Sequence, residues 1–366
     1  MLFVSLRPRT IRRVLGVLLG LALLVLGLRL WAVDVLRVVE QSMWPSLHGG
    51  SDRVLLERWR RTPERFEIWA FSGETGAGLF VKRVLALPGE AIALRGGDLW
   101  LRAADGTESR VQRTPELVAQ MSVRQPGPRA CDPARWVLLK GEMSALGGES
   151  LEWRGPQGFE AVLRGCIAAD VLSVMDDFVG NEGLTHPGKH VVSDTSLDVR
   201  CFPVNGRVEL VHAIQGDSRG VVIEGDRLST LDGRPLGRVP AAGQALRIST
   251  LDGEFSVVTT ESSGERELVH ENRNTLPGAG LSQWIVRGSG QAHMQLLDLR
   301  RDVHYVFDGA MSAIASYQVA AEACFVAGDN QSVSIDSRTL GPVPLARMQG
   351  CVTRILWPRA RAGRLD

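Results

Sequence analysis

The chain has 366 residues, a length that exceeds one ordinary domain and suits two or three, and its 44% of hydrophobic residues is enough for buried cores. The formal net charge is only +1, so bulk electrostatics give no reason to expect a nucleic-acid partner. Forty glycines and seventeen prolines, with few helical patterns after about residue 40, predict a turn-rich, mostly β protein.

An apolar segment follows an arginine-rich beginning. Residues 1–13 carry Arg7, Arg9, Arg12 and Arg13. Residues 14–28 are apolar without a break, and residues 30–33 continue the run past Arg29, which can snorkel to the headgroups. About twenty such residues predict a transmembrane anchor within residues 1–36, with its N-terminus in the cytoplasm and the rest of the chain outside. A cleavable signal peptide is the alternative, but residues 30–34 match a small-x-small cleavage site poorly.

The first strands are predicted around two stretches with unusual polar residues. A short strand over residues 34–40 leads directly into Gln41-Ser42-Met43-Trp44-Pro45-Ser46. Further strands are expected at 52–57, 66–71 and 79–87, the last of which carries Lys82 and Arg83 and ends at the turn Pro88-Gly89-Glu90. Residues 91–94 and 98–102 form a hairpin, and residues 115–121 a short helix that Thr114 caps.

The middle of the chain is predicted to be an inserted β module over residues 169–310. Short alternating runs recur between turns at residues 196–202, 207–214, 220–224, 245–250, 254–260, 282–286, 291–297 and 304–307. Eight such runs favour an antiparallel sandwich or jelly roll. The hairpin at residues 247–255 resembles those of concanavalin-like lectin and laminin-G sandwiches. Strands at 136–140 and 151–153 are assigned instead to an extra β region of the part before it, residues 37–168.

After residue 310 a second polar signature appears between strands predicted at 324–327 and 343–347. It reads Gly328-Asp329-Asn330-Gln331-Ser332-Val333-Ser334-Ile335-Asp336-Ser337-Arg338. Together with the stretches around Ser42 and Lys82, in this order, it resembles the boxes of the type I signal peptidase family, membrane-bound serine–lysine proteases that cut leader peptides from exported proteins. The resemblance covers roughly residues 1–100 and 315–358. It implies an antiparallel β catalytic core in two parts, residues 37–168 and 311–366, that the insert separates.

A serine hydroxyl needs a base before it can attack, and a lysine can serve if desolvation lowers its pKa. Of the seven histidines, only His48 lies near the Ser42 box, and a turn is expected there. Lys82 is flanked by apolar residues on its strand, as such a base requires. The resemblance implies Ser42 as the nucleophile, Lys82 as the general base and Ser334 as the residue that orients the lysine.

The resemblance also implies supporting roles for four charged residues and one amide. Asp336 and Arg338 correspond to a structural ion pair, Arg83 to the arginine beside the lysine, and Asp329 with Asn330 to the turn that carries the third box. The backbone N–H of Ser42 would form the oxyanion hole. Many members have a small residue before the nucleophile as a second donor, whereas this chain has Glu40 and Gln41.

The cysteines and carboxylates do not predict a metal site. Cys131, Cys166, Cys201, Cys324 and Cys351 lack Cys-x-x-Cys spacing, and the family needs no cofactor or metal. Asp52, Asp329 and Asp336 are expected in turns and ion pairs. Cys324 and Cys351 lie on neighbouring predicted strands, so both a disulfide and two buried thiols are open.

These predictions describe a single-pass serine endopeptidase on the outer face of a bacterial inner membrane. Its partners are the lipid bilayer and preproteins with small residues before the cleavage site. A second hypothesis is a membrane-tethered binding protein, in which the insert captures a ligand and the peptidase part is an inactive scaffold, as the Glu40-Gln41 departure favours. A third is a specialised protease whose insert selects its substrate.

Overall fold

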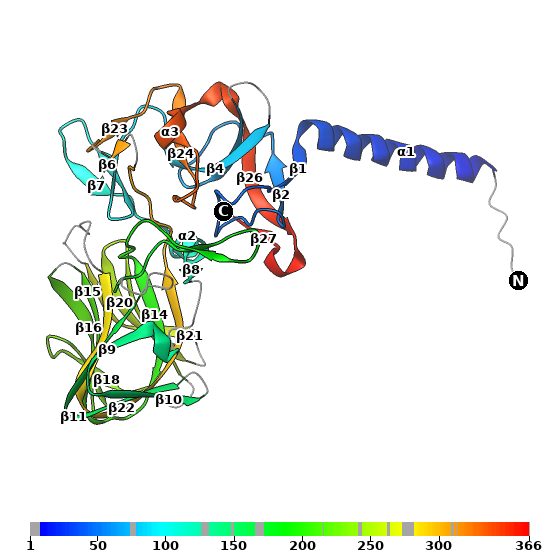
Figure 1. The fold of residues 1–366 in the computed structure, drawn as a ribbon. Coiled ribbons are helices and arrows are strands. Elements are labelled where there is room, and N and C mark those ends of the chain that lie inside the picture. Colours follow the sequence, from blue (N-terminus) through cyan, green and yellow to red (C-terminus); the bar gives the residue numbers. More distant parts are fainter. Residues whose placement is uncertain are drawn as a thin grey trace, which may run out of the picture.

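The computed structural model describes residues 8–73, 78–125, 132–147, 150–164, 172–214, 216–240, 244–261, 264–272, 282–308, 311–312 and 314–365. These residues form two bodies of antiparallel strands, with a helix projecting from the first body (Figure 1). The helices are α1 (Pro8–Trp31), α2 (Pro115–Met121) and α3 (Ser337–Leu340), with short 3-10 turns η1 (Pro133–Arg135), η3 (Leu345–Arg347) and η4 (Arg359–Arg361). The prediction of a mostly β, antiparallel protein is confirmed.

The first body is built on a sheet that interleaves both ends of the chain. Its order is β1-β2-β26-β3-β4-β24-β25, with β27 beside β26. These strands are β1 (Val33–Arg37), β2 (Arg53–Glu57), β3 (Ile68–Ser72), β4 (Leu79–Ala86), β24 (Ala323–Ala327), β25 (Val343–Pro344), β26 (Met348–Trp357) and β27 (Gly363–Arg364). Because β26 lies between β2 and β3, and β24 pairs with β4, this sheet brings the Ser42 loop, Lys82 and the third box together.

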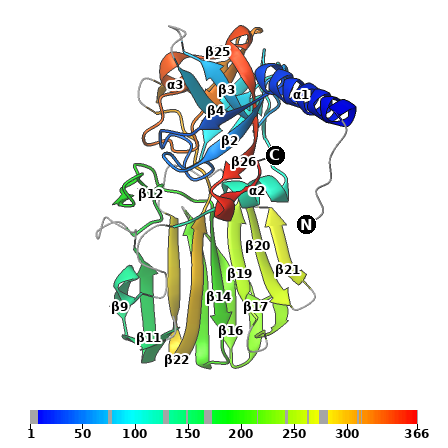
Figure 2. The same cartoon turned by 90° about the vertical axis from the view of Figure 1, so that its right-hand side faces the viewer.

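A smaller sheet completes this body, in the order β23 (Tyr317–Gln318), β5 (Ala91–Arg95), β6 (Asp98–Arg102), β7 (Glu108–Arg110). The predicted β5–β6 hairpin turns at Gly96 and Gly97, whose positive φ angles of 62° and 99° suit a tight two-residue turn. The expected Thr114 cap is also present, since its side chain accepts the N–H of Leu117 at the start of α2. Helix α2 lies between the two bodies in both views (Figures 1 and 2).

The second body is a thirteen-stranded sheet. Its strands are β8 (Val123–Arg124), β9 (Trp136–Lys140), β10 (Glu142–Gly147), β11 (Ser150–Leu163), β14 (Thr195–Cys201), β15 (Asn205–Ile214), β16 (Asp217–Glu224), β17 (Arg227–Thr230), β18 (Pro235–Arg238), β19 (Leu246–Leu251), β20 (Glu254–Glu261), β21 (Gly264–Asn272) and β22 (Ser282–Arg301). Beside it, β12 (Phe178–Val179) and β13 (Thr185–His186) form a separate two-stranded hairpin.

Strand β22 folds the large sheet into two layers. Its first part pairs with β15 and its second part with β14. The Trp284 Nε1 atom donates to Thr195 Oγ1 at 3.0 Å, although Thr195 pairs with Arg301. A straight strand would hold residues 284 and 301 about 55 Å apart. The strand therefore turns back, and it does so at Gly288–Gly290, where a Cβ on Gly288 would lie 2.1 Å from a backbone oxygen of β15.

Strand β11 bends in the same way. Its register with β22 shifts between Gly155 and Phe159, and it pairs with β10 before the shift and with β9 after it. The two bent strands enclose a single core, in which the fully buried side chains include Trp153, Phe159, Phe255 and Trp284. No helix in the described part of the chain covers this core, so the sheet buries its own apolar face.

The large sheet takes strands from both sides of the expected boundary at residue 169. Strands β9 to β11, which we assigned to the peptidase part, pair with each other and with β22. Residues 282–286 and 291–297, expected as two strands, belong to the one bent strand β22. Residues 304–307, also expected as a strand, contribute only an isolated bridge between Tyr305 and Gly97. Strands β17, β18 and β21 were not predicted.

Within the described residues, no helix combines the length and the apolar character that a bilayer crossing requires. The anchor therefore stays a prediction, and Arg7 lies outside the described residues. Cys201, Cys324 and Cys351 form no disulfide and are buried thiols, while Cys131 and Cys166 fall outside the described part.

Candidate functional site

Ser42 and Lys82 meet in the first body. Ser42 lies in the loop after β1 and is 8% exposed; Lys82 lies in the middle of β4 and is 2% exposed. The Lys82 Nζ atom is 2.7 Å from Ser42 Oγ and 3.2 Å from the Val81 carbonyl oxygen. The structure thus pairs the predicted nucleophile with the predicted base at hydrogen-bonding distance. It forms no hydrogen bond between Ser42 and a histidine among the described residues.

The surroundings of Lys82 favour its neutral form. Burial lowers the pKa of Lys82, because a charged ammonium loses its hydration inside the protein. The carboxylates of Asp336, Glu40 and Asp329 oppose this shift, and Arg338 adds to it. Burial outweighs the carboxylates, so the amine is more easily deprotonated than an ordinary lysine.

A buried ion pair lies beside the two residues. The Arg83 guanidinium donates from Nε and Nη2 to the two oxygens of Asp329, at 2.9 and 2.7 Å. Arg83 also donates to the Phe66 carbonyl at 2.7 Å and to Ser46 Oγ at 2.9 Å, and Tyr305 OH donates to Asp329 at 2.5 Å. Arg83 is 1% exposed, and the charge of Asp329 raises its pKa further. This network fixes β4, the Ser42 loop and the third box relative to one another.

The pairing of Arg83 with Asp329 was not predicted. Successive side chains on a strand point to opposite faces, so Arg83 projects away from Lys82 and needs a buried partner of its own. That argument could have identified Asp329 from the sequence. Ser46 and Tyr305 carry no comparable signal in the sequence. Tyr305, in particular, comes from the end of the region expected as the insert.

The third box holds the backbone of the nucleophile loop. The Asn330 N–H donates to the Ser42 carbonyl at 3.0 Å, and Asn330 Nδ2 donates to the Gln41 carbonyl at 3.2 Å. A Cβ on Gly328 would lie 2.4 Å from the Ser42 carbonyl oxygen and 2.2 Å from Ser334 Oγ. Glycine at this position therefore permits the close approach of the two loops.

Asp336 and Arg338 form the expected ion pair. Arg338 Nε and Nη2 donate to the carboxylate at 2.9 and 3.0 Å, and the Gly328 N–H donates to the same group at 2.9 Å. No hydrogen bond joins Ser334 to Lys82 in this structure; the Ser334 side chain lies instead by the Asp336 carboxylate and, together with Arg338, helps to lower the pKa of that group. Its expected role in orienting the lysine stays a prediction.

The structure also locates the glutamate that departs from the family pattern. The Glu40 side chain is exposed, but its carboxylate lies close enough to Lys82 to oppose the lowering of the lysine's pKa. His48 is part-buried, and burial, with Arg361, lowers its pKa.

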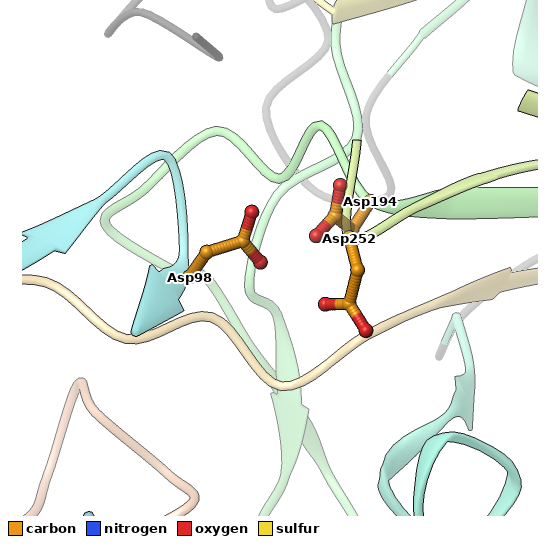
Figure 3. Close-up of side chains that lie close together, drawn as sticks. All are labelled: Asp98, Asp194 and Asp252. Carbon is orange, nitrogen blue, oxygen red and sulfur yellow. The ribbon is translucent and has the colours of Figure 1, made fainter. Parts of the chain in front are cut away.

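A separate group of carboxylates lies between the two bodies (Figure 3). Asp98, Asp194 and Asp252 bring oxygens within 4.8 Å of one another, as ligands of a cation would. Two arginines lie in the same group: Arg110 pairs with Asp98 at 3.2 Å, and Arg113 bridges Asp252 and Asp302.

Four carboxylates and two guanidinium groups leave two negative charges when all are ionised, and the surroundings favour protonation of part of the carboxylates. Burial raises the pKa of Asp98, and it raises that of Asp194 to about 7, with Asp302 and Asp252 adding to the shift at Asp194. The two cationic side chains already occupy positions around the carboxylates. The carboxylates therefore fit a group that is neutralised by the two arginines and by shared protons better than they fit a metal site.

Comparison with known proteins gives the class of the chain. The profile described as "Signal peptidase, peptidase S26" matches residues 11–129 and 282–357, which together make up more than half of the sequence. The chain belongs to the signal peptidase family, and its large sheet lies mostly in the gap between the two matched segments. A search of curated proteins found no significant match.

Solved structures resemble this chain only weakly. Peanut lectin with a 9mer peptide matches at 11% identity, over 49% of this chain and 95% of the lectin, with a TM-score of 0.29. The Crh5 transglycosylase in complex with NAG matches at 8% identity, over 63% and 93%, with a TM-score of 0.32. An alginate lyase from Klebsiella pneumoniae matches at 10% identity, over 60% and 97%, with a TM-score of 0.31. Scores this low carry no argument about fold or function.

Proposed function

We propose that this protein is a membrane-anchored serine endopeptidase that removes leader peptides from exported preproteins, with Ser42 as the nucleophile and Lys82 as the general base. The observation that carries the proposal is the 2.7 Å approach of a buried lysine to a serine hydroxyl. Membership of the signal peptidase family supports the same reaction.

The chemistry follows from these groups. The neutral Lys82 amine takes the proton of Ser42 Oγ as the oxygen attacks the scissile carbonyl, and the Ser42 backbone N–H stabilises the oxyanion. The ammonium then gives its proton to the leaving nitrogen as the peptide bond breaks. Water, activated by the same amine, hydrolyses the acyl ester and frees the serine. The Asn330 contacts to Gln41 and Ser42 hold the attacking loop in place for each step.

The membrane part of the proposal rests on α1. Its described side chains from Leu15 to Gly27 are apolar and exposed. An exposed apolar surface of this kind is unfavourable in water. In a bilayer, lipid tails cover the apolar side chains, and the hydrogen bonds within the helix satisfy its backbone polar groups. Because β1 follows α1 after one residue, the anchor would hold Ser42 near the outer face of a bacterial inner membrane.

The test uses the full chain in detergent with a preprotein that carries an Ala-x-Ala cleavage site. We expect the wild type to cut after the second alanine, and Ser42→Ala and Lys82→Met to lose activity by at least about a thousandfold. Ser51→Ala, an exposed serine nine positions on, and Lys140→Met, an exposed lysine of β9 in the second body, are the matched controls. Mass spectrometry locates the cut.

A membrane-tethered binding protein on an inactive scaffold remains the second candidate. It is supported by the departure at Glu40 and Gln41 from the usual small residue before the nucleophile. A wild type that cuts no leader, and that an acylating serine inhibitor fails to label at Ser42, would favour it over the peptidase.

A further inference from the structure

The hairpin of β12 and β13 reaches the residues that precede Ser42. Asn181, at its tip, donates from Nδ2 to the Val39 carbonyl at 3.1 Å. The next residue, Glu182, lies within hydrogen-bonding reach of the Gln41 side chain. The hairpin therefore covers the backbone that leads into the nucleophile, although it belongs to the region between the two segments that match the family profile.

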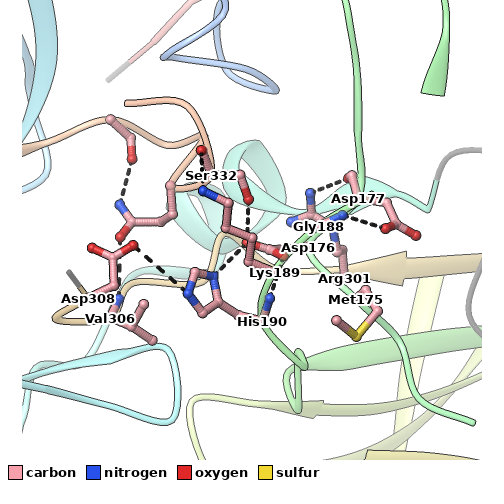
Figure 4. Close-up of polar contacts among 12 residues, drawn as sticks. Met175, Asp176, Asp177, Gly188, Lys189, His190, Arg301, Val306, Asp308 and Ser332 are labelled. Atoms are coloured by element: carbon pink, nitrogen blue, oxygen red, sulfur yellow. Dashed lines mark hydrogen bonds and ion pairs between the residues drawn. The ribbon is translucent and has the colours of Figure 1, made fainter. Parts of the chain in front are cut away.

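The base of the hairpin is fixed more firmly than its tip (Figure 4). Lys189 Nζ donates to the Ser332 carbonyl, and Ser332 Oγ donates to Asp176, each at 3.2 Å. His190 contacts Asp176 at 2.9 Å, and the Asp308 carboxylate lies near its other ring nitrogen. Several polar contacts thus hold the base on the third box, whereas one exposed hydrogen bond holds Asn181, so the tip is the part that a ligand can displace.

A cavity lies under the tip. It has a volume of about 560 Å³, with Gln41 and Trp44 on one side and Val179, Gly180 and Asn181 on the other. The dimensions suit a few side chains of a peptide. The cavity adjoins the nucleophile loop through Gln41 and Trp44, whereas Ser42 and Lys82 are not among its lining residues, so a peptide in it would reach Ser42 along this loop.

A peptide that presents its scissile carbonyl to Ser42 has to pass the residues just before it. Extended peptides bind such open backbone through main-chain hydrogen bonds, and β1 is the edge strand of its sheet. Asn181 already donates to the Val39 carbonyl, so a peptide that pairs with this carbonyl has to replace that bond.

We propose that the β12–β13 hairpin selects substrates for Ser42: it admits peptides that fit the cavity and displace Asn181, and it excludes others. This inference rests on the proposed peptidase function. It assigns a role in specificity to residues 178–186 and makes Asn181 a specificity-determining residue outside the proposed catalytic groups.

The experiment compares Asn181→Ala with Asn205→Ala, an exposed asparagine at the far end of the second body. Loss of one competing hydrogen bond should lower KM for a leader peptide about threefold with kcat unchanged. Replacing Asn181-Glu182 by Gly-Gly should lower it more and extend cleavage to peptides with bulkier residues before the cut. Asn205→Ala should match the wild type.

Binding provides the readout that does not depend on cleavage. In the Ser42→Ala background, fluorescence anisotropy with a labelled leader peptide should show tighter binding when Asn181→Ala is added. If the wild type cleaves leaders but Asn181→Ala changes neither KM nor the range of substrates, the hairpin proposal is overturned and the peptidase function stands. If the wild type is inert, the peptidase function fails, and unchanged peptide binding on adding Asn181→Ala then overturns the hairpin role as well.

Discussion

The buried pair of Arg83 and Asp329 allows the most direct test of how the site is held together. Asp329→Asn keeps the size of the side chain and removes its charge. Arg83 would then keep one amide oxygen at position 329, the Phe66 carbonyl and Ser46 Oγ as acceptors, none of which carries a charge. The Arg83 and Asp329 side chains are 1% and 0% exposed, so water cannot replace the lost carboxylate. Leaving a buried charge without its partner costs about 3–5 kcal/mol.

The measurement is the free energy of unfolding in urea, followed by tryptophan fluorescence in detergent. The matched control is Asp226→Asn, which removes a carboxylate from a pair with Arg238 whose side chains are 51% and 84% exposed. That change should stay within about 0.5 kcal/mol. The double replacement Arg83→Met with Asp329→Leu should cost less than Asp329→Asn alone, because no unpaired charge remains. The reasoning is refuted if Asp329→Asn destabilises the protein no more than Asp226→Asn.

Three further predictions concern protons and close packing. Because the proposed base Lys82 can accept a proton only when neutral, kcat/KM should rise with pH through a pKa below the ordinary lysine value of 10.5. Glu40→Gln should move this rise to lower pH, since Glu40 raises the pKa of Lys82, whereas Glu64→Gln should not move it. The pKa of Asp194 is raised to about 7, so its contribution to stability is full below about pH 4 and is lost as pH rises through 7. Asp194→Asn should therefore raise the Tm at about pH 8 and leave it nearly unchanged at about pH 4. An equal effect on the Tm at both pH values would contradict the shared protons. Gly328→Ala should lower kcat/KM by more than about tenfold, because the added methyl group would push Ser334 and the Ser42 carbonyl apart. Gly363→Ala is the control, because this glycine has open space around it. Normal activity in both variants would show that the loops tolerate the methyl group.

The sequence was sufficient to predict that Ser42 and Lys82 meet, but not the contacts that support them. Ser42 and Lys82 are separated in the sequence by only a turn and the two strands β2 and β3, and each lies in a recognisable pattern, so their meeting was expected. The partners Ser46 and Tyr305 were not, because their contacts depend on how distant loops fold over the sheet. The same limit applies to β22. The alternation of apolar residues predicted two strands, and the hydrogen bond between the Trp284 and Thr195 side chains shows that a single strand turns back.

The expected boundary of the insert differed from the observed sheet for a related reason. Local patterns identify strands but not their partners, and β11 reads equally well as part of either body until its pairing with β22 is known. The polar group of Asp98, Asp194 and Asp252 was missed as well. Its members are far apart in sequence, and single aspartates next to glycines or strand ends are normally turn residues.

The way the second body joins the first explains how a catalytic core tolerates so large an addition. The chain enters the large sheet at β8 and leaves it at the end of β22, and these two segments pair, with Val123 opposite Arg301. Because the two ends of the insertion lie side by side, the first body has to bridge only a short distance between them. The insertion therefore adds little strain to the sheet that holds Ser42 and Lys82. A joint of this kind would leave the second body free to turn, but Arg113 links Asp252 of that body to Asp302, and the Arg110 guanidinium of the first body lies against Gly253 of the second. These buried contacts restrict the rotation of the second body relative to the first. In our proposal this restriction keeps the tip of the β12–β13 hairpin over Val39 rather than beside it.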